Sequence, residues 1–184
     1  MSSKLEFVQD PEKIRHFLQL LRTQEEAKTI TFLEQFSLTE LRDTIIINNG
    51  ERMTFMDCAA IQGAAQVMKV LHEKGMSIDS PTISVFGSIN LPVLNYLIDN
   101  NAFMANVSDV HGLTPLQNVL THYKRFVDRR PIYLQVIELM LHCKSDPFLK
   151  GFQDLTPVDL ANLIGDTPLL KLLTNKQTNS INFH

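Results

Sequence analysis

Two Thr-Pro pairs with the same flanking pattern restrict the folds open to this chain more than any other feature. They are Thr114-Pro115 and Thr156-Pro157, each followed by apolar residues at helical spacing. A threonine hydroxyl can cap a helix, and proline suits the first helical position because no N–H is needed there. We therefore predict that a helix begins at each pair, and that the two stretches are copies of one structural unit.

Two further segments have the same shape, a first helix of small residues, a polar break and a leucine-rich second helix. Residues 49–79 contain Ala59-Ala60, and the chain then carries Gly63 and Gly75 where helices are expected to end. Residues 80–106 have Ser80-Pro81 in place of Thr-Pro. Four consecutive units of two helices each are therefore predicted.

The four segments resemble the ankyrin repeat, which has a period of ~33 residues, a turn, two helices and a Thr-Pro-Leu-His-x-Ala signature. Thr114-Pro115-Leu116 and Thr156-Pro157-Val158 match the start of that signature. The resemblance covers residues 49–173 as about four repeats. It implies an all-α fold, an ankyrin-repeat solenoid of helix-turn-helix repeats with short hairpin turns, behind a helical N-terminal cap.

The chain departs from the family pattern at two places. Between Gly75 and Ser80 it is about seven residues short of the ~33-residue period, so a truncated hairpin is expected there. The two Thr-Pro pairs lie 42 residues apart. We attribute this excess to an insertion of about nine residues, at 123–131, relative to the same ~33-residue period.

Residues 1–48 are predicted to be helical and to cap the first repeat, because an open end of a repeat array exposes apolar surface. Helices are expected from Asp10-Pro11, over 25–36 and over 39–46. A further degenerate repeat or a separate interaction motif are alternatives for this region. Residues 174–184 form a polar tail, which we expect to be disordered.

The resemblance implies a function, because the concave surface of ankyrin arrays holds partner proteins. The matching positions in this chain are Met53, Ile61, Val110, His111, Leu113, Thr121, His122, Phe152, Gln153, Leu155, Leu163 and Ile164. Several of them are apolar, and packing against the cap or a neighbouring repeat is the alternative role for each.

A basic stretch within the insertion is a second candidate site. It carries Lys124, Arg125, Arg129 and Arg130. These cations form either a docking loop for an acidic partner or phosphate, or a solvated extension of the first helix with Phe126 and Val127 packed inward. We favour the solvated extension, since charge runs are usually solvated faces.

Sequence signatures of catalysis, metal binding and cofactor binding are missing. The six histidines are scattered, and no glycine-rich phosphate loop occurs among the seven glycines. Cys58 and Cys143 fall in apolar helical patterns, so they are predicted to be reduced core thiols without a disulfide or a metal. We expect no cofactor, no metal and no enzymatic activity; an enzyme with an unrecognised site is the competing hypothesis.

Charge and hydropathy narrow the classes of partner. The formal net charge is −3 and the sequence pI is about 6.0, which gives no general attraction to nucleic acid or to anionic lipid. No stretch approaches the ~18 apolar residues of a membrane span. The expectation is a cytoplasmic monomer that binds a partner protein. The alternative is a bacterial effector that is delivered into a host cell and binds proteins there.

Overall fold

The structure is a computed structural model that describes residues 11–48 and 51–175. Over these residues the chain forms eleven α-helices, three short 3-10 helices and one two-stranded sheet. The predicted mainly helical content is confirmed. In chain order the elements are α1 (Pro11–Arg22), α2 (Glu26–Leu33), α3 (Leu38–Asp43), β1 (Ile46–Asn48), β2 (Glu51–Met53), α4 (Phe55–Ile61), α5 (Ala65–Glu73), α6 (Pro81–Phe86), η1 (Gly87–Ile89), α7 (Leu91–Asp99), α8 (Pro115–Arg125), η2 (Val127–Arg129), α9 (Arg130–His142), η3 (Phe152–Asp154), α10 (Pro157–Ile164) and α11 (Thr167–Thr174).

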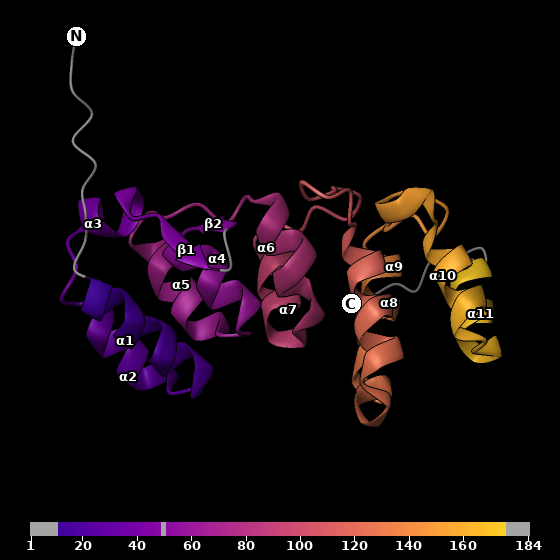
Figure 1. Cartoon of the computed structure of the whole chain (residues 1–184), viewed down its shortest axis with the longest axis horizontal. Coiled ribbons are helices and arrows are strands. Elements are labelled where there is room, and N and C mark those ends of the chain that lie inside the picture. Colours follow the sequence, from indigo (N-terminus) through magenta and orange to yellow (C-terminus); the bar gives the residue numbers. More distant parts are fainter. Residues whose placement is uncertain (1–10, 49–50, 176–184) are drawn as a thin grey trace, which may run out of the picture.

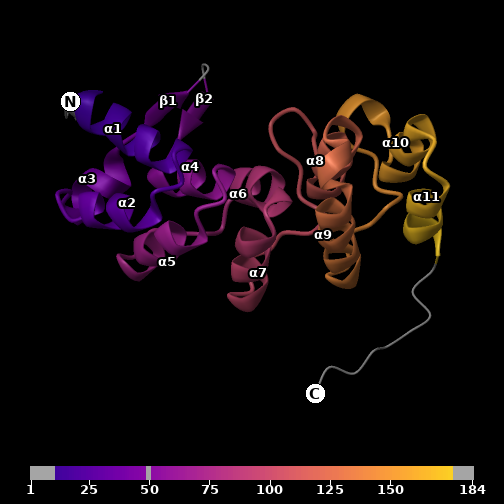
Figure 2. The same ribbon diagram turned by 90° about the horizontal axis from the view of Figure 1, so that it is seen from below.

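The helices form antiparallel pairs that stand side by side in one row (Figure 1). Helix α4 contacts α6, α6 contacts α8, and α8 contacts α10; in the same way α5 contacts α7, α7 contacts α9, and α9 contacts α11. Figure 2 shows the first helices of the pairs along one side and the second helices along the other. Each pair therefore packs mainly on the pairs before and after it.

The predicted helix starts are confirmed at both Thr-Pro pairs. Thr114 and Thr156 each accept a hydrogen bond from the third helical residue, and the side chain of that residue binds back to the threonine N–H. Thr54 begins α4 with the same reciprocal cap, and Ser80 caps α6 ahead of Pro81. Such caps satisfy backbone donors that a helix otherwise leaves unpaired.

The chain leaves the second helices of three pairs through the same turn. In each turn one residue has a left-handed backbone. The N–H of the residue after it donates to the carbonyl oxygen of the residue five positions earlier, at 2.8–3.1 Å. The left-handed residues are Gly75, Asn101 and Lys144, with φ of 85°, 54° and 67°. A non-glycine residue tolerates this conformation at a cost, so the turn is imposed by the packing of consecutive pairs.

The N-terminal region is helical as predicted, although its boundaries differ. Helix α2 ends at Leu33, three residues before the predicted end, and α3 ends at Asp43 instead of at Ile46. Ile46 lies in β1, opposite Met53 of β2. The β-branched run from Thr44 to Ile47 favours a strand over a helix, which explains the early end of α3.

Helices α1 and α2 form a pair that packs on the next one, because α1 contacts α4 and α2 contacts α5. The predicted capping residue Asp10 lies outside the described residues. So does most of the predicted polar tail, since α11 ends at Thr174 and the description at Asn175.

The core divides into two clusters of buried side chains. The N-terminal cluster is built on aromatic rings: Phe17 and Phe36 both pack edge-on against Phe55, with ring centroids 4.7 and 5.2 Å apart. The C-terminal cluster is mostly aliphatic and includes Val119 and Val136 of α8 and α9. Within the described part of the chain, no helix is both long enough and apolar enough to cross a membrane.

Candidate functional site

The turns that precede α8 and α10 are closed by the same backbone hydrogen bonds and lie next to each other. Asp109 N–H donates to Leu113 O, and Gly151 N–H donates to Leu155 O, both at 3.0 Å. A Cβ atom on Gly112 would lie 3.7 Å from the nitrogen of Phe152, which places the two turns in contact. Side chains of successive turns are therefore presented on one continuous surface.

Gln117 of α8 locks the two turns together and is fully buried. Its Oε1 accepts from the backbone N–H of Thr114 at 3.2 Å and of Phe152 at 3.1 Å, while its Nε2 donates to Leu155 O at 2.7 Å. Gly151 makes room for this amide, because a Cβ there would collide with Gln117 and lie 2.7 Å from Gly112 O. The next turn is thus held rigidly against the start of α8.

A small pocket opens between α8, η3 and α10, just beyond this amide. Its volume is about 220 Å³. It is lined by Leu113, Gln117, Leu120, Thr121, Lys124, Phe152, Gln153, Leu155, Leu160, Leu163 and Ile164. Sites for small-molecule ligands usually measure about 300–1,000 Å³. This pocket is smaller, and it suits a single large apolar side chain better than a whole substrate.

Seven of the twelve positions predicted to face a partner line this pocket. They are Leu113, Thr121, Phe152, Gln153, Leu155, Leu163 and Ile164. Leu163 keeps 67% of its surface exposed and Phe152 keeps 44%, although both are large and apolar. We call the surface formed by these seven residues the α8–α10 face.

The other five predicted positions lie elsewhere. Val110 and His111 are exposed in the turn before α8, where Val110 has 93% of its surface in solvent. His122 is half-buried; its Nδ1–H donates to Asn118 O at 3.0 Å, and its ring stacks on Phe126. The ring also lies 6.1 Å from that of Tyr133 in α9, which places the imidazole at the α8–α9 contact, whereas the pocket lies between α8 and α10.

Met53 and Ile61 belong to the N-terminal core instead of an open surface. Met53 is only 7% exposed, and Ile61 packs against the same cluster. Both lie with Leu18 and Arg22 of α1 around a small gap. The reason is that α1 covers the α4 side of the row, so packing against the N-terminal helices is the role that these two residues have.

The prediction missed Gln117, Leu120 and Leu160, which also line the pocket. Helical spacing could have identified the two leucines. Leu120 lies four positions before Lys124, and Leu160 lies three before Leu163, so each shares a helix face with a residue that was chosen. Gln117 could have been found as the third residue after a Thr-Pro cap, although its contacts with the next turn could not.

The basic insertion forms the end of the α8–α9 pair, which extends beyond the neighbouring pairs (Figure 1). Lys124, Arg125 and Arg129 are exposed. Val127 was expected to pack inward, and this is wrong, because 62% of its surface is exposed. The short helix η2 interrupts the chain after Phe126 and turns Val127 away from the core, while Phe126 itself is half-buried.

Arg130 differs from the other three cations, because it has structural partners. Its guanidinium lies over the ring of Tyr123 at 4.8 Å and 3.7 Å from the carboxylate of Asp166. Tyr123 Oη donates to the same carboxylate at 2.7 Å. The hydrogen bonds from Tyr123 and from Leu169 N–H lower the pKa of Asp166, with a smaller effect of Arg130. The pKa of Tyr123 is raised to about 12, mainly by burial and next by the hydrogen bond to Asp166. This cluster joins the α8–α9 pair to the start of α11.

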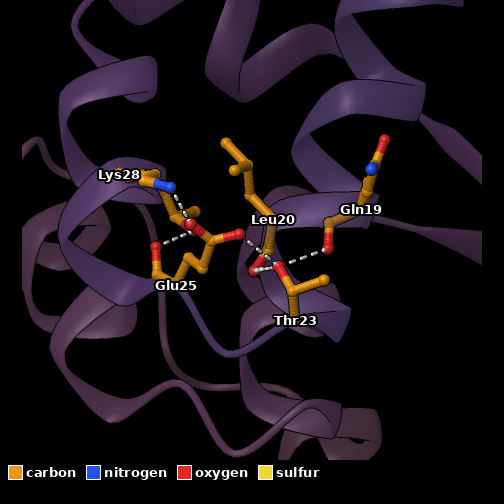
Figure 3. Close-up of polar contacts among 6 residues, drawn as sticks. Gln19, Leu20, Thr23, Glu25 and Lys28 are labelled. Carbon is orange, nitrogen blue, oxygen red and sulfur yellow. Dashed lines mark hydrogen bonds and ion pairs between the residues drawn. The ribbon is translucent and has the colours of Figure 1, made fainter.

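A wider depression lies at the other end of the row, between α1 and α2. Its lining includes Glu25, which pairs with Lys28 and lies 3.0 Å from Thr23 Oγ1 (Figure 3). Thr23 Oγ1 is also within 3.2 Å of the carbonyl oxygens of Gln19 and Leu20. The hydrogen bonds from Lys28 and Thr23 lower the pKa of Glu25. An ionised, paired carboxylate closes the α1–α2 turn and is not poised to donate a proton.

The two cysteines are free thiols, as predicted for their redox state. Cys58 is buried in the N-terminal core, and burial raises its pKa to about 12, so it stays protonated at neutral pH. Cys143 was expected in the core, but it ends α9 and is only half-buried. Among the residues that the structure describes, no group of three or more His, Cys, Asp or Glu side chains could hold a metal ion.

Comparison with known proteins adds no family to these observations. No protein-family model matches the chain, and no curated protein matches it.

Proposed function

We propose that residues 49–173 are an array of about four ankyrin-type repeats, and that the protein works by binding a partner protein through the α8–α10 face. The observation that carries this proposal is the pocket of that face. It gathers seven side chains, chosen as partner contacts from the sequence, from two consecutive helical pairs.

Recurrent local geometry supports the array. The reciprocal cap occurs at Thr54, Thr114 and Thr156, each before the first helix of a pair. The left-handed turn after the second helix recurs at three sites, as described above. A repeat protein needs both features in register, because each unit must return the chain to the same orientation before the next unit stacks on it.

The N-terminal pair fits the same scheme as a degenerate unit. Gln24 between α1 and α2 is left-handed with φ of 57°, and Gly63 between α4 and α5 is left-handed with φ of 77°. The N–H of the next residue donates in both cases to a carbonyl five residues back, at 3.1 and 2.9 Å. This favours a degenerate repeat over an unrelated cap for residues 11–33, while α3 and the β1–β2 hairpin are additions to it.

Binding is favoured over folding as the role of the exposed apolar residues. Leu163 and Phe152 remain largely exposed, although buried side chains of the same size fill the core beside them. The surface behind them is held by the buried amide of Gln117. A preorganised apolar pocket loses little entropy when a partner docks, and one central anchor of this kind typically contributes at least ~2 kcal/mol.

Affinity capture with matched variants tests the proposal. Leu163 and Ile47 are both aliphatic and exposed to 67% and 64%, but only Leu163 lies on the α8–α10 face. We expect the wild-type chain and Ile47→Glu to retain the same stoichiometric partner from a lysate of the source organism, and Leu163→Glu to lose it. Circular dichroism checks that both variants fold. Retention by Leu163→Glu at wild-type level would place the interface elsewhere.

A further inference from the structure

The rim of the α8–α10 pocket carries one kind of charge. Of its lining residues, only Lys124 is ionisable, and the other polar lining groups are amides and a hydroxyl. The amide of Gln117 is buried and already bonded at both ends, and Thr121 Oγ1 donates to Gln117 O at 3.0 Å. In the pocket, therefore, a partner meets apolar carbon and one ammonium group.

The part of the fold that the structure describes does not neutralise Lys124 at the pocket, nor Arg125 and Arg129 in the basic insertion. Within residues 11–48 and 51–175, Lys124, Arg125 and Arg129 form no ion pair. Arg125 lies over the ring of Phe126, which leaves its charge uncompensated. Asp128 is the single carboxylate in this stretch, so these four residues together carry a net charge of about +2 at neutral pH.

The carboxylates nearest the pocket are already engaged. Asp154 binds Lys150 at 2.9 Å. Asp159 caps α10 by accepting from the N–H and the hydroxyl of Thr156, and these bonds lower its pKa. Asp166 accepts from Tyr123. The donors to Asp159 are neutral, so this carboxylate keeps its charge, but among the described residues that line the pocket the one charge is that of Lys124.

We propose that the partner presents an acidic, apolar segment to this site. One large aliphatic or aromatic side chain enters the pocket beside Leu163 and Phe152, and one or more carboxylates lie over Lys124. The inference rests on the proposed function, because it specifies the chemistry of the partner at the same face. The pocket volume fits one side chain of the partner. The positive charge of Lys124 favours acidic residues next to that side chain.

Peptide display on the immobilised full-length chain tests the partner chemistry. Random peptides are selected in parallel on the wild-type chain, Lys124→Glu, Lys69→Glu and Leu163→Glu. Lys69 lies exposed on α5, far along the row from the pocket, so Lys69→Glu controls for the change in net charge. Circular dichroism and gel filtration establish that each variant is folded before selection.

The wild-type chain and Lys69→Glu should enrich peptides in which Leu, Ile, Phe or Met lies within a few residues of Asp or Glu. Lys124→Glu should lose the acidic preference, and synthetic acidic peptides from the selection should bind it about three- to tenfold more weakly at low salt. That difference should shrink at 0.5 M NaCl, because added salt screens exposed charges.

Three outcomes overturn the inference, and they are distinguishable from failure of the proposed function. Enrichment of apolar peptides without acidic residues, or an acidic preference that Lys124→Glu keeps, rejects the acidic segment while the face still binds. Enrichment on the wild-type chain that Leu163→Glu retains in full rejects the pocket, and with it the proposed function. Self-association of the wild-type chain that is lost in Leu163→Glu identifies a second copy as the occupant and also rejects the inference.

Discussion

The two helical pairs that begin with Thr-Pro have the same local construction and very different surroundings. Helices α8 and α10 start with the same reciprocal cap, follow turns that are closed by the same backbone hydrogen bonds, and begin 42 residues apart. Yet α8 buries most of its residues, including the polar Gln117 and Asn118, whereas α10 buries only Pro157 and Ala161. Two helices that begin with the same cap thus differ in burial: α8 is a core helix, and α10 is half-exposed.

Neighbouring pairs account for this difference. Helix α8 contacts both α6 and α10, whereas α10 has α8 on one side and no described helix on the other. The residue that follows the cap by seven positions is Thr121 in α8 and Leu163 in α10. The larger, apolar residue of the two, Leu163, therefore lies on the more exposed helix. Folding alone would favour the opposite arrangement, with the apolar residue on the buried helix. This inversion supports the proposal that the α8–α10 face binds a partner.

The largest effect should come from the polar residue that only the inner pair buries. Gln117→Ala removes the back half of the cap, so the buried Thr114 N–H and the Phe152 N–H lose their acceptor, and Leu155 O keeps only the bond from Gly151 N–H. We expect a loss of about 3 kcal/mol in the free energy of unfolding, because each unpaired buried group costs about 1–3 kcal/mol. Urea denaturation followed by circular dichroism measures it.

Asp159→Ala is the matched control, since Asp159 occupies the same cap position in α10 but is exposed. Its loss should be clearly smaller than that of Gln117→Ala. Equal losses for the two variants would mean that the cap alone matters, and that the contact of Gln117 with the next turn contributes nothing.

A glycine between the two pairs should give the next largest effect. In Gly151→Ala the new Cβ collides with the buried Gln117 side chain and lies 2.7 Å from Gly112 O, so the turn must shift. We expect a loss of about 2 kcal/mol, which is typical of overpacking. Gly165→Ala meets no atom within 4 Å, and its φ of +75° costs only about 1 kcal/mol. The reverse order would contradict the tight contact between the two turns.

How far the sequence predicts this molecule depends on whether a feature is local. The helix starts at Thr114 and Thr156 depend on a hydroxyl and a proline within a few residues, so the pattern predicts them correctly. The burial of Met53 and the exposure of Val127 depend on α1 and on η2, which a local pattern does not place. The pocket was predicted in part, because its residues follow the period of the turns and helices, while the contacts of Gln117 with the next turn depend on how two pairs stack, which a local pattern does not place.

The hydrogen bond between Tyr123 of α8 and Asp166 at the start of α11 should make the stability of the α10–α11 pair fall in acid. The pKa of Asp166 is lowered in the folded chain, so its contribution to stability is complete above its unfolded pKa of about 3.9. That contribution is lost as the pH falls through the lower, folded value. Asp166→Asn keeps a side chain that can cap α11, and should flatten the fall in stability below about pH 4.

Thermal unfolding between pH 2.5 and pH 7 measures this effect. Asp99→Asn removes an exposed carboxylate of α7 and should keep the wild-type profile. A wild-type profile for Asp166→Asn would show that another carboxylate controls the acid sensitivity of the fold.

The smallest change in stability is expected at the residue with the greatest proposed role in binding. Leu163→Ala removes a side chain that is 67% exposed, so the free energy of unfolding should change by no more than about 0.5 kcal/mol. Val119→Ala, in the fully buried core of α8, should lose about 1–2 kcal/mol under the same conditions, because it leaves a cavity. A loss above 1 kcal/mol for Leu163→Ala would mean that this leucine packs as part of the fold. The contrast between the two pairs would then disappear, because α10 would bury its apolar face as α8 does, and the α8–α10 face would lose the residue on which its proposed partner contact depends.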